Sequence, residues 1–156
     1  MKRQWDVEEL IEQFTLLPPE IEWLGENEEH NHLGKAISLK FFQQEGRFPE
    51  SGAEIPPAIV EHIAHQLGLP TEALSHYDWQ GRRAREHKRA IRELYGFRRA
   101  TVTDQDELRT WLVEEVLPYE HRPTYLEQLV EQRLQQLHIE PPTQGQIERL
   151  VTSALL

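Results

Sequence analysis

The chain has 156 residues, of which 38% are hydrophobic and 28% are charged, and its formal net charge is −10 at pH 7. This length is sufficient for one ordinary domain or for two small helical ones. Four Trp, five Phe and four Tyr supply large core side chains, so the composition excludes a disordered acidic tail. The absence of cysteine excludes a disulfide framework, a thiolate metal site and a cysteine nucleophile.

No apolar run approaches the roughly 20 residues that are needed to cross a bilayer. The start of the chain, MKRQWDVEEL, lacks the apolar core of a secretory signal. We therefore expect a cytoplasmic protein without a membrane partner. The sequence contains no phosphate-binding glycine loop, no nucleophile elbow and no carboxylates at the spacing of an acid–base pair. We expect no catalytic residue, no cofactor and no small-molecule substrate.

The N-terminal part of the chain is predicted to form helices that are separated by proline and glycine. Asp6 and Glu9 have the spacing of a capping box, which starts the first helix. The apolar face of that helix is formed by Val7, Leu10, Ile11 and Phe14. Pro18 ends this helix and opens a short second one, and a polar loop is expected over residues 25–31.

A buried central helix is predicted over residues 33–44, because apolar side chains fall on more than one of its faces. Pro57 starts a further helix that Gly68 ends, and Pro70 opens a shorter one. A helix, a glycine turn and a second helix are compatible with a helix-turn-helix. Many helical bundles share this pattern, so it does not identify the motif.

The C-terminal part is also predicted to be helical. A basic helix is expected over residues 80–95, and Gly96 closes it. Thr103 is expected to cap the next helix, Pro118 follows its end, and Pro123 opens another. The apolar faces of the last three helices are Leu108, Trp111, Leu112 and Val116; Leu126, Leu129, Val130, Leu134 and Leu137; and Ile147, Leu150, Val151, Ala154 and Leu155.

The sequence therefore predicts an all-α protein, since it shows no run of alternating strand residues and no internal repeat. We expect two small multi-helix subdomains with helix-turn-helix-like elements, residues 1–75 and residues 76–156, the second beginning with the basic helix. The core is predicted to contain Val7, Phe14, Ile37, Phe41, Ile63, Trp111, Leu129 and Leu150. The last helical pattern runs to the end of the chain without a stop signal, as in a fragment of a longer protein or at a natural C-terminus.

Positive charge is concentrated in one segment of this acidic chain. Residues 82–99 contain eight basic side chains against Glu86 and Glu93, a net charge of +6, whereas the remainder carries −16. On a helical wheel, one stripe is formed by Arg82, Arg85, Arg89 and Arg92. The apolar face beside it is formed by Ala84, His87, Ile91, Leu94 and Tyr95. Such a helix can pack on a core and present arginines to phosphates or to a groove of DNA. The candidate DNA-binding residues are Arg82, Arg83, Arg85, Lys88, Arg89, Arg92, Arg98 and Arg99.

Other interpretations of these residues stay open. The arginines could pair with the protein's own carboxylates on a solvated helix, or they could bind an acidic protein partner. His62 and His65 have the spacing of metal ligands on a helix, but no third ligand completes the pair, so we expect no bound metal. Trp79 is either a packing residue or a platform on which a base stacks.

Five stretches are distributed over essentially the whole chain: KRQWDVEELIEQFTLLPPE, LKFFQQEGRFP, YDWQGRRAREHKRAIRELYGFRRAT, WLVEEVLP and LHIEPPTQGQIERLVTSAL. In this order and at nearly constant spacing, they resemble the N-terminal region of transposases of the Tn-three family, the replicative transposons of bacteria. The resemblance implies that the DNA contacts include Arg82, Arg83, Arg85, Lys88, Arg89 and Arg92.

The resemblance also implies a function. The chain would recognise the terminal inverted repeats of a transposon during DNA transposition, without being an enzyme itself. In this family the DDE-type catalytic domain and its divalent metal lie far downstream, so we do not expect them here. The implied partner is double-stranded DNA at the transposon ends, and other transposase subunits are further candidates. The alternative is a helical protein-interaction module that mediates transposase assembly or binds an acidic partner.

Overall fold

The computed structural model describes all 156 residues, and apart from one pair of two-residue strands its regular structure is helical. The α-helices are α1 (Val7–Phe14), α2 (Pro18–Leu24), α3 (Glu29–Glu45), α4 (Pro57–Leu67), α5 (Arg82–Tyr95), α6 (Val102–Trp111), α7 (Pro123–Gln136) and α8 (Gln144–Leu155). The short elements are the 3-10 helices η1 (Gly52–Glu54) and η2 (Thr71–His76), the π-helical turn η3 (Leu112–Val116), and the strands β1 (Arg98–Arg99) and β2 (Ile139–Glu140). The predicted all-α fold is confirmed. None of the helices combines the length and the apolar composition that a membrane span requires.

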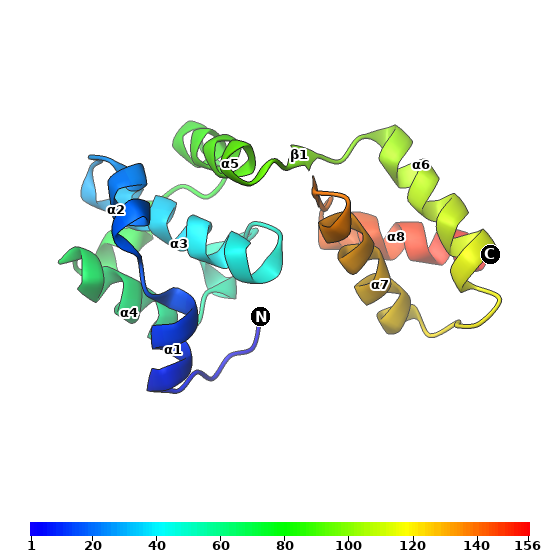
Figure 1. Cartoon of the computed structure of the whole chain (residues 1–156), viewed down its shortest axis with the longest axis horizontal. Helices are drawn as coiled ribbons and strands as arrows, with labels where there is room; N and C mark the ends of the chain where they lie inside the picture. The colour runs from blue at the N-terminus through cyan, green and yellow to red at the C-terminus, as the bar shows by residue number, and fades with distance from the viewer. The chain divides into compact units, whose positions relative to one another are not determined.

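The chain divides into two compact units, Met1–Ile91 and Arg92–Leu156. In the first unit, α3 is the central helix, with α4 on one side and α5 on the other (Figure 1). Leu33, Ile37 and Phe41 are spaced by one helical turn along α3, and all three are buried. They share one apolar cluster with side chains of α1, α2 and α4. A helix that is apolar on several faces therefore takes the middle of the unit, as the sequence predicts.

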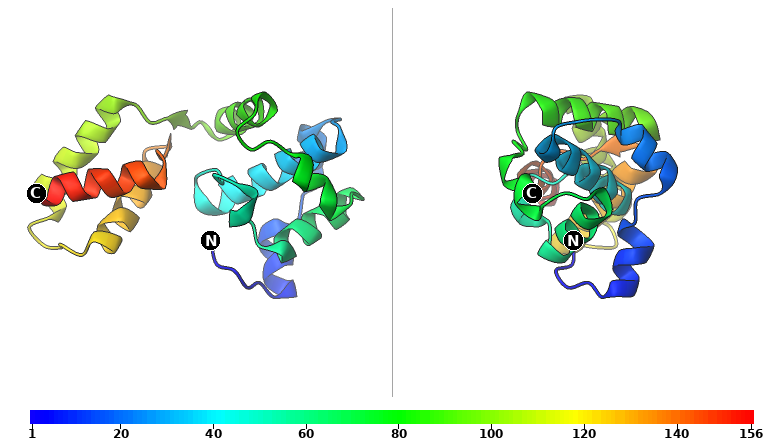
Figure 2. Two further views of the ribbon diagram at one scale, coloured as in Figure 1. Left: turned by 180° about the vertical axis from the view of Figure 1, so that it is seen from behind. Right: turned by 90° about the vertical axis from the view of Figure 1, so that its left-hand side faces the viewer.

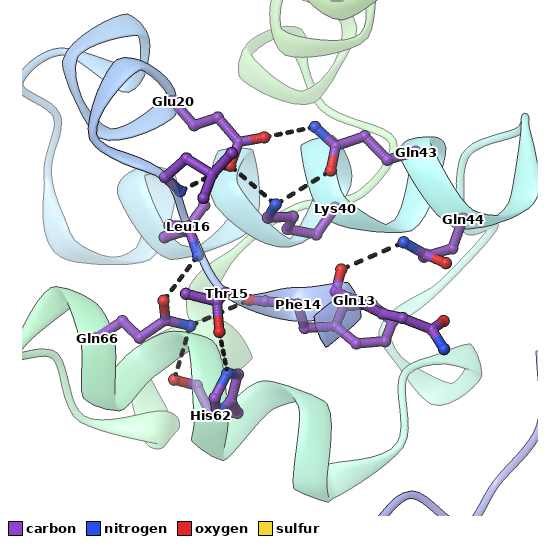
Figure 3. A network of polar contacts seen from close by, with 11 residues as sticks. Gln13, Phe14, Thr15, Leu16, Glu20, Lys40, Gln43, Gln44, His62 and Gln66 are labelled. Carbon is purple, nitrogen blue, oxygen red and sulfur yellow. Dashed lines mark hydrogen bonds and ion pairs between the residues drawn. The ribbon is translucent and has the colours of Figure 1, made fainter. Parts of the chain in front are cut away.

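Polar contacts fix the connection between α1 and α2 (Figure 3). The side chain of Gln66, on α4, accepts from the backbone nitrogen of Leu16 at 2.7 Å and donates to the carbonyl oxygen of Phe14 at 3.0 Å. On the other side, the buried Nζ of Lys40 donates to the Glu20 carboxylate at 2.8 Å and joins α3 to α2. Backbone groups that the two helix ends leave open are thus satisfied by side chains.

In the second unit, α8 packs against both α6 and α7 (Figure 2). The core of this unit contains Leu108, Leu112, Leu126, Val130, Leu134, Ile147 and Val151. The strands β1 and β2 run parallel, with Arg98 opposite Ile139 and Arg99 opposite Glu140. This short pairing attaches the segment after α5 to the connection between α7 and α8.

Most of the predicted core is buried. The buried members are Phe14, Ile37, Phe41, Ile63 and Leu150, and the half-buried ones are Trp111 and Leu129. The prediction for Val7 is wrong: its side chain is 70% exposed, and that of Ile11 on the same face is 54% exposed. The ring of Trp5, which precedes α1, packs edge-on against Phe14 with centroids 5.0 Å apart. Phe14 at the C-terminal end of α1 is therefore its fully buried residue, and Leu10 packs partly against the same core.

The start of α6 also differs from the prediction, because Thr101 and not Thr103 is its cap. Oγ1 of Thr101 accepts from the backbone nitrogen of Asp104 at 3.1 Å, and the Asp104 carboxylate accepts from the backbone nitrogen of Thr101 at 2.8 Å. Thr103 and Asp106 have the same spacing in the sequence. Asp104, however, is also held by Arg98, which selects the earlier cap.

Three further boundaries differ from the predicted ones. The central helix α3 begins at Glu29, so its first turn takes in part of the loop expected over residues 25–31. The short helix after Pro70 is a 3-10 helix. The two units divide within α5 and not after residue 75, since His87 and its neighbours on α5 are buried in the first unit. Beyond this division, Leu94 of the predicted apolar face is 49% exposed.

Candidate nucleic-acid interface

The basic segment of the sequence folds into α5, and local contacts fix both ends of this helix. Before it, the Asp78 carboxylate accepts from the backbone nitrogen of Gln80 at 3.0 Å, which turns the chain into the helix. After it, Gly96 takes a left-handed φ of 69° and closes the last turn. The helix therefore holds its basic side chains at defined positions.

α5 has one buried face and one exposed basic face. Ala84, His87 and Ile91 lie at i, i+3 and i+7, and all three are buried. The exposed basic side chains of α5 are Arg82, Arg83, Arg85 and Arg89, and the half-buried ones are Lys88 and Arg92. Arg82, Arg85 and Arg89 lie opposite the buried face. Arg83 lies beside them, between these three arginines and the buried face. We call these four exposed arginines the arginine face. Lys88 and Arg89 also have interactions within the protein.

Glu86 neutralises part of the arginine face. Its carboxylate accepts from Nε of Arg82 and from Nη1 of Arg83, each at 3.1 Å. The hydrogen bond from Arg82, and then that from Arg83, lowers the pKa of Glu86, so the carboxylate is charged at neutral pH. Because two guanidinium groups share one carboxylate, this cluster keeps a net positive charge. Exposed ion pairs are weak, so a phosphate can take the place of Glu86.

Two of the candidate residues have no carboxylate partner. Nη1 of Arg85 donates to the carbonyl oxygen of Gln80 at 2.9 Å, and this bond holds the guanidinium beside the first turn of α5. Arg99 is exposed on β1 and forms no ion pair. Both side chains can bind an anion without first breaking a salt bridge.

Arg92 is engaged within the protein. Its Nη1 lies 2.9 Å from the Glu140 carboxylate, and the two side chains are only 16% and 17% exposed. This ion pair joins the last turn of α5 to β2, in the second unit. The structure thus places Arg92 away from the exposed part of the predicted stripe.

Arg98 is also paired within the protein, although its side chain is 56% exposed. Its two terminal nitrogens bind the two oxygens of Asp104 at 2.6 and 2.7 Å, the bidentate geometry that suits a guanidinium and a carboxylate. The hydrogen bond from Arg98 is the main cause that holds the pKa of Asp104 well below its usual range. Arg98 therefore stabilises the start of α6.

A comparison with known protein families matches residues 1–154 to the family described as Domain of unknown function (DUF4158). The chain belongs to this family. The match covers both compact units, so the helix that carries the arginine face lies inside the DUF4158 region. A comparison with curated proteins gave no match.

Three side chains that shape the candidate interface of this DUF4158 chain were not identified from the sequence. They are Tyr77, Asp104 and Glu140. Asp104 follows Thr101 at the spacing of a capping box, so its part in starting α6 could have been found. Glu140 is 48 residues away from Arg92, and no local pattern connects the two. Tyr77 reaches His87 across a turn, through a contact that only the folded chain creates.

The remaining candidates have packing roles in the structure. Trp79 is half-buried, and its ring meets Tyr77 edge-on with centroids 4.9 Å apart. Its indole also lies so close to Gly52 that a Cβ there would be 3.1 Å from Nε1. Nε2 of His62 contacts Oγ1 of Thr15 at 3.3 Å. Nowhere do three or more His, Cys, Asp or Glu side chains form a group that could hold a metal ion.

Proposed function

We propose that the chain binds double-stranded DNA through the arginine face of α5, and that this DNA is the terminal inverted repeat of a transposon. The observation that carries the proposal is the arrangement of Arg82, Arg85 and Arg89. They follow one another on the exposed face of a helix whose opposite face is buried, so all three can reach the same ligand.

The dimensions and the charge of α5 suit DNA. From Arg82 to Arg89 the helix rises about 10 Å, a length over which one strand of DNA places about three phosphates. An α-helix also fits the major groove, where an arginine can bind a guanine edge with two hydrogen bonds. Outside residues 82–99 the chain carries a net charge of −16, which repels DNA. The favourable approach is therefore through α5.

The predicted DNA-binding residues fall into two groups in this proposal. Contacts with DNA are assigned to Arg82, Arg83, Arg85, Arg89 and Arg99, with Lys88 at the edge of the same helix. Arg92 and Arg98 instead stabilise the fold, through Glu140 and Asp104. This division revises the sequence-based proposal, in which all eight basic residues contact DNA.

The resemblance to the N-terminal region of Tn-three family transposases supports transposon ends as the DNA that is bound. In this proposal the chain works in the bacterial cytoplasm as a recognition module, without a cofactor and without catalysis of its own. A separate DDE-type domain of the parent transposase cuts and joins the strands. Other transposase subunits are proposed partners on the assembled ends.

A second candidate function is the binding of an acidic protein, such as another part of the transposase assembly. It is favoured by Glu86, whose carboxylate already occupies two guanidinium groups of the arginine face. A carboxylate of a partner could bind there in the same way. DNA is the first choice because its phosphates recur along a strand at a spacing that serves the whole face.

The test is fluorescence anisotropy of the chain with two labelled duplexes, one with the terminal inverted repeat and one with the same bases scrambled. We expect tighter binding of the repeat at every salt concentration. Log K falls as log salt rises, and each neutralised phosphate makes this slope steeper by about 0.9. Four to five arginines on phosphates therefore predict a slope of about −4. Equal affinity for both duplexes would contradict end recognition. No binding of either, with binding of an acidic transposase fragment, would support the second function.

A further inference from the structure

We infer that His87, on the buried face of α5, and its partner Tyr77 position the arginine face on the other side of the helix so that it discriminates between DNA sequences. This inference rests on the proposed function and names the positioning residues of the same site. It predicts that specificity for the transposon end depends on two buried side chains that carry no charge.

The pair is a directional contact inside the first unit. The hydroxyl of Tyr77 lies 2.7 Å from Nδ1 of His87, and the two rings are stacked with centroids 5.7 Å apart. Both side chains are buried. Ser38, on α3, also hydrogen-bonds the Tyr77 hydroxyl, so a chain of three polar groups runs from the central helix to the basic one. No buried side-chain nitrogen or oxygen lacks a partner.

Both rings of this pair are uncharged at neutral pH. Burial lowers the pKa of His87 to about 4, so its ring is neutral at pH 7 and has one acceptor nitrogen. Burial also raises the pKa of Tyr77, which the hydrogen bond with Ser38 opposes, so its phenol keeps its proton. The phenol can therefore donate to Nδ1 of His87 when the ring carries its own proton on Nε2.

The Tyr77 ring cannot shift to accommodate a change. It lies directly on α3 at Gly34, where an added Cβ would be 2.4 Å from Cδ1 of the ring. Trp79 covers another side of the ring edge-on. The hydroxyl of Tyr77 is therefore fixed relative to α3, and through His87 it fixes the rotation of α5 about its own axis.

Apolar packing and the Tyr77–His87 contact constrain α5 in different ways. Ala84 and Ile91 bury their apolar side chains, and His87 between them adds a hydrogen bond. A hydrogen bond requires a direction, whereas apolar contact does not. A rotation of about 20° moves side chains at the surface of a helix by about 2 Å. That displacement breaks hydrogen bonds to base edges but hardly changes attraction to phosphates, which acts over longer distances.

The test compares variants of the chain on the repeat and on the scrambled duplex. Tyr77→Phe should stay folded and keep the affinity and salt slope of the wild type on scrambled DNA. Its preference for the repeat should fall about tenfold, the loss expected for one base contact. The double variant Tyr77→Phe with His87→Leu replaces both polar partners and should regain thermal stability. It should not regain the preference, which separates a positioning role from a purely structural one.

A second pair of variants covers the case in which Tyr77→Phe does not fold. Oδ1 of an asparagine can take the place of Nδ1, so His87→Asn should keep more of the preference for the repeat than His87→Leu does. Equal preference of these two variants, or an unchanged preference in folded Tyr77→Phe, would overturn the inference while the proposed function stands. If the wild type itself shows no preference for the repeat, the proposed function fails and the inference fails with it.

Discussion

Replacement of Arg92 with Ala is expected to destabilise the second unit without removing a DNA contact. The ion pair of Arg92 with Glu140 is 2.9 Å long, and both side chains are less than one-fifth exposed. An exposed pair contributes under about 1 kcal/mol, whereas breaking a fully buried pair costs about 3–5 kcal/mol. For this half-buried pair we expect a loss of about 1–3 kcal/mol. In a unit of this size, that lowers the Tm by roughly 7–22 °C.

Thermal unfolding of Arg92→Ala, Glu140→Ala and the double variant measures this energy as a coupling. The double variant should lose less free energy of unfolding than the sum of the losses in the two single variants, because neither side chain is left as a lone half-buried charge. At a temperature where Arg92→Ala is folded, its salt slope on DNA should equal that of the wild type. A variant with an unchanged Tm and a slope reduced by about 0.9 would refute this reasoning and make Arg92 a DNA contact.

Three further predictions concern local features of the fold. Thr101→Ala removes the cap of α6 and should lower the free energy of unfolding by about 1 kcal/mol, whereas Thr101→Ser should keep it. Since the pKa of His87 is lowered to about 4 in the folded state, from about 6.5 in the unfolded chain, stability should be lost as the pH falls from about 6.5 to about 4. Urea unfolding across this range should show a smaller loss in His87→Leu, and an equal loss in both proteins would contradict the assignment. Gly34→Ala places a Cβ 2.4 Å from the Tyr77 ring and should lower the Tm clearly, while Gly145→Ala, where a Cβ meets only an ordinary contact at 3.6 Å, should not.

Much of the fold could be predicted because its determinants are local. Asp6 and Glu9 form the capping box that their spacing predicts, and the buried residues of α8 follow the helical period. The error at Val7 arises where a local pattern competes with tertiary packing. The face on which it lies is apolar, but Phe14 and Leu10 pack on the core, Trp5 meets Phe14 from outside the helix, and Val7 and Ile11 stay exposed.

The candidate site shows the same limit. A helical wheel identifies the exposed stripe of Arg82, Arg85 and Arg89, because side-chain direction on a helix is set by position alone. It cannot show that Arg92, in the same stripe, is paired, since the partner Glu140 lies on β2, which the β1–β2 pairing holds beside the segment after α5. Charge counting gives all basic residues of the segment equal weight, whereas the structure shows which of them form ion pairs with carboxylates of the second unit, namely Arg92 and Arg98.

The central claim is that the arginine face of α5 contacts DNA, and the double variant Arg85→Ala/Arg89→Ala tests it most directly. A matched control is Arg109→Ala/Arg122→Ala, which removes two exposed arginines outside α5 and gives the same net charge. Binding of the terminal inverted repeat is measured by fluorescence anisotropy over a range of salt concentrations, with circular dichroism to confirm the fold. We predict weaker binding and a salt slope flatter by nearly 2 for the α5 variant, and an almost unchanged slope for the control. A folded α5 variant with wild-type affinity and slope would contradict the account.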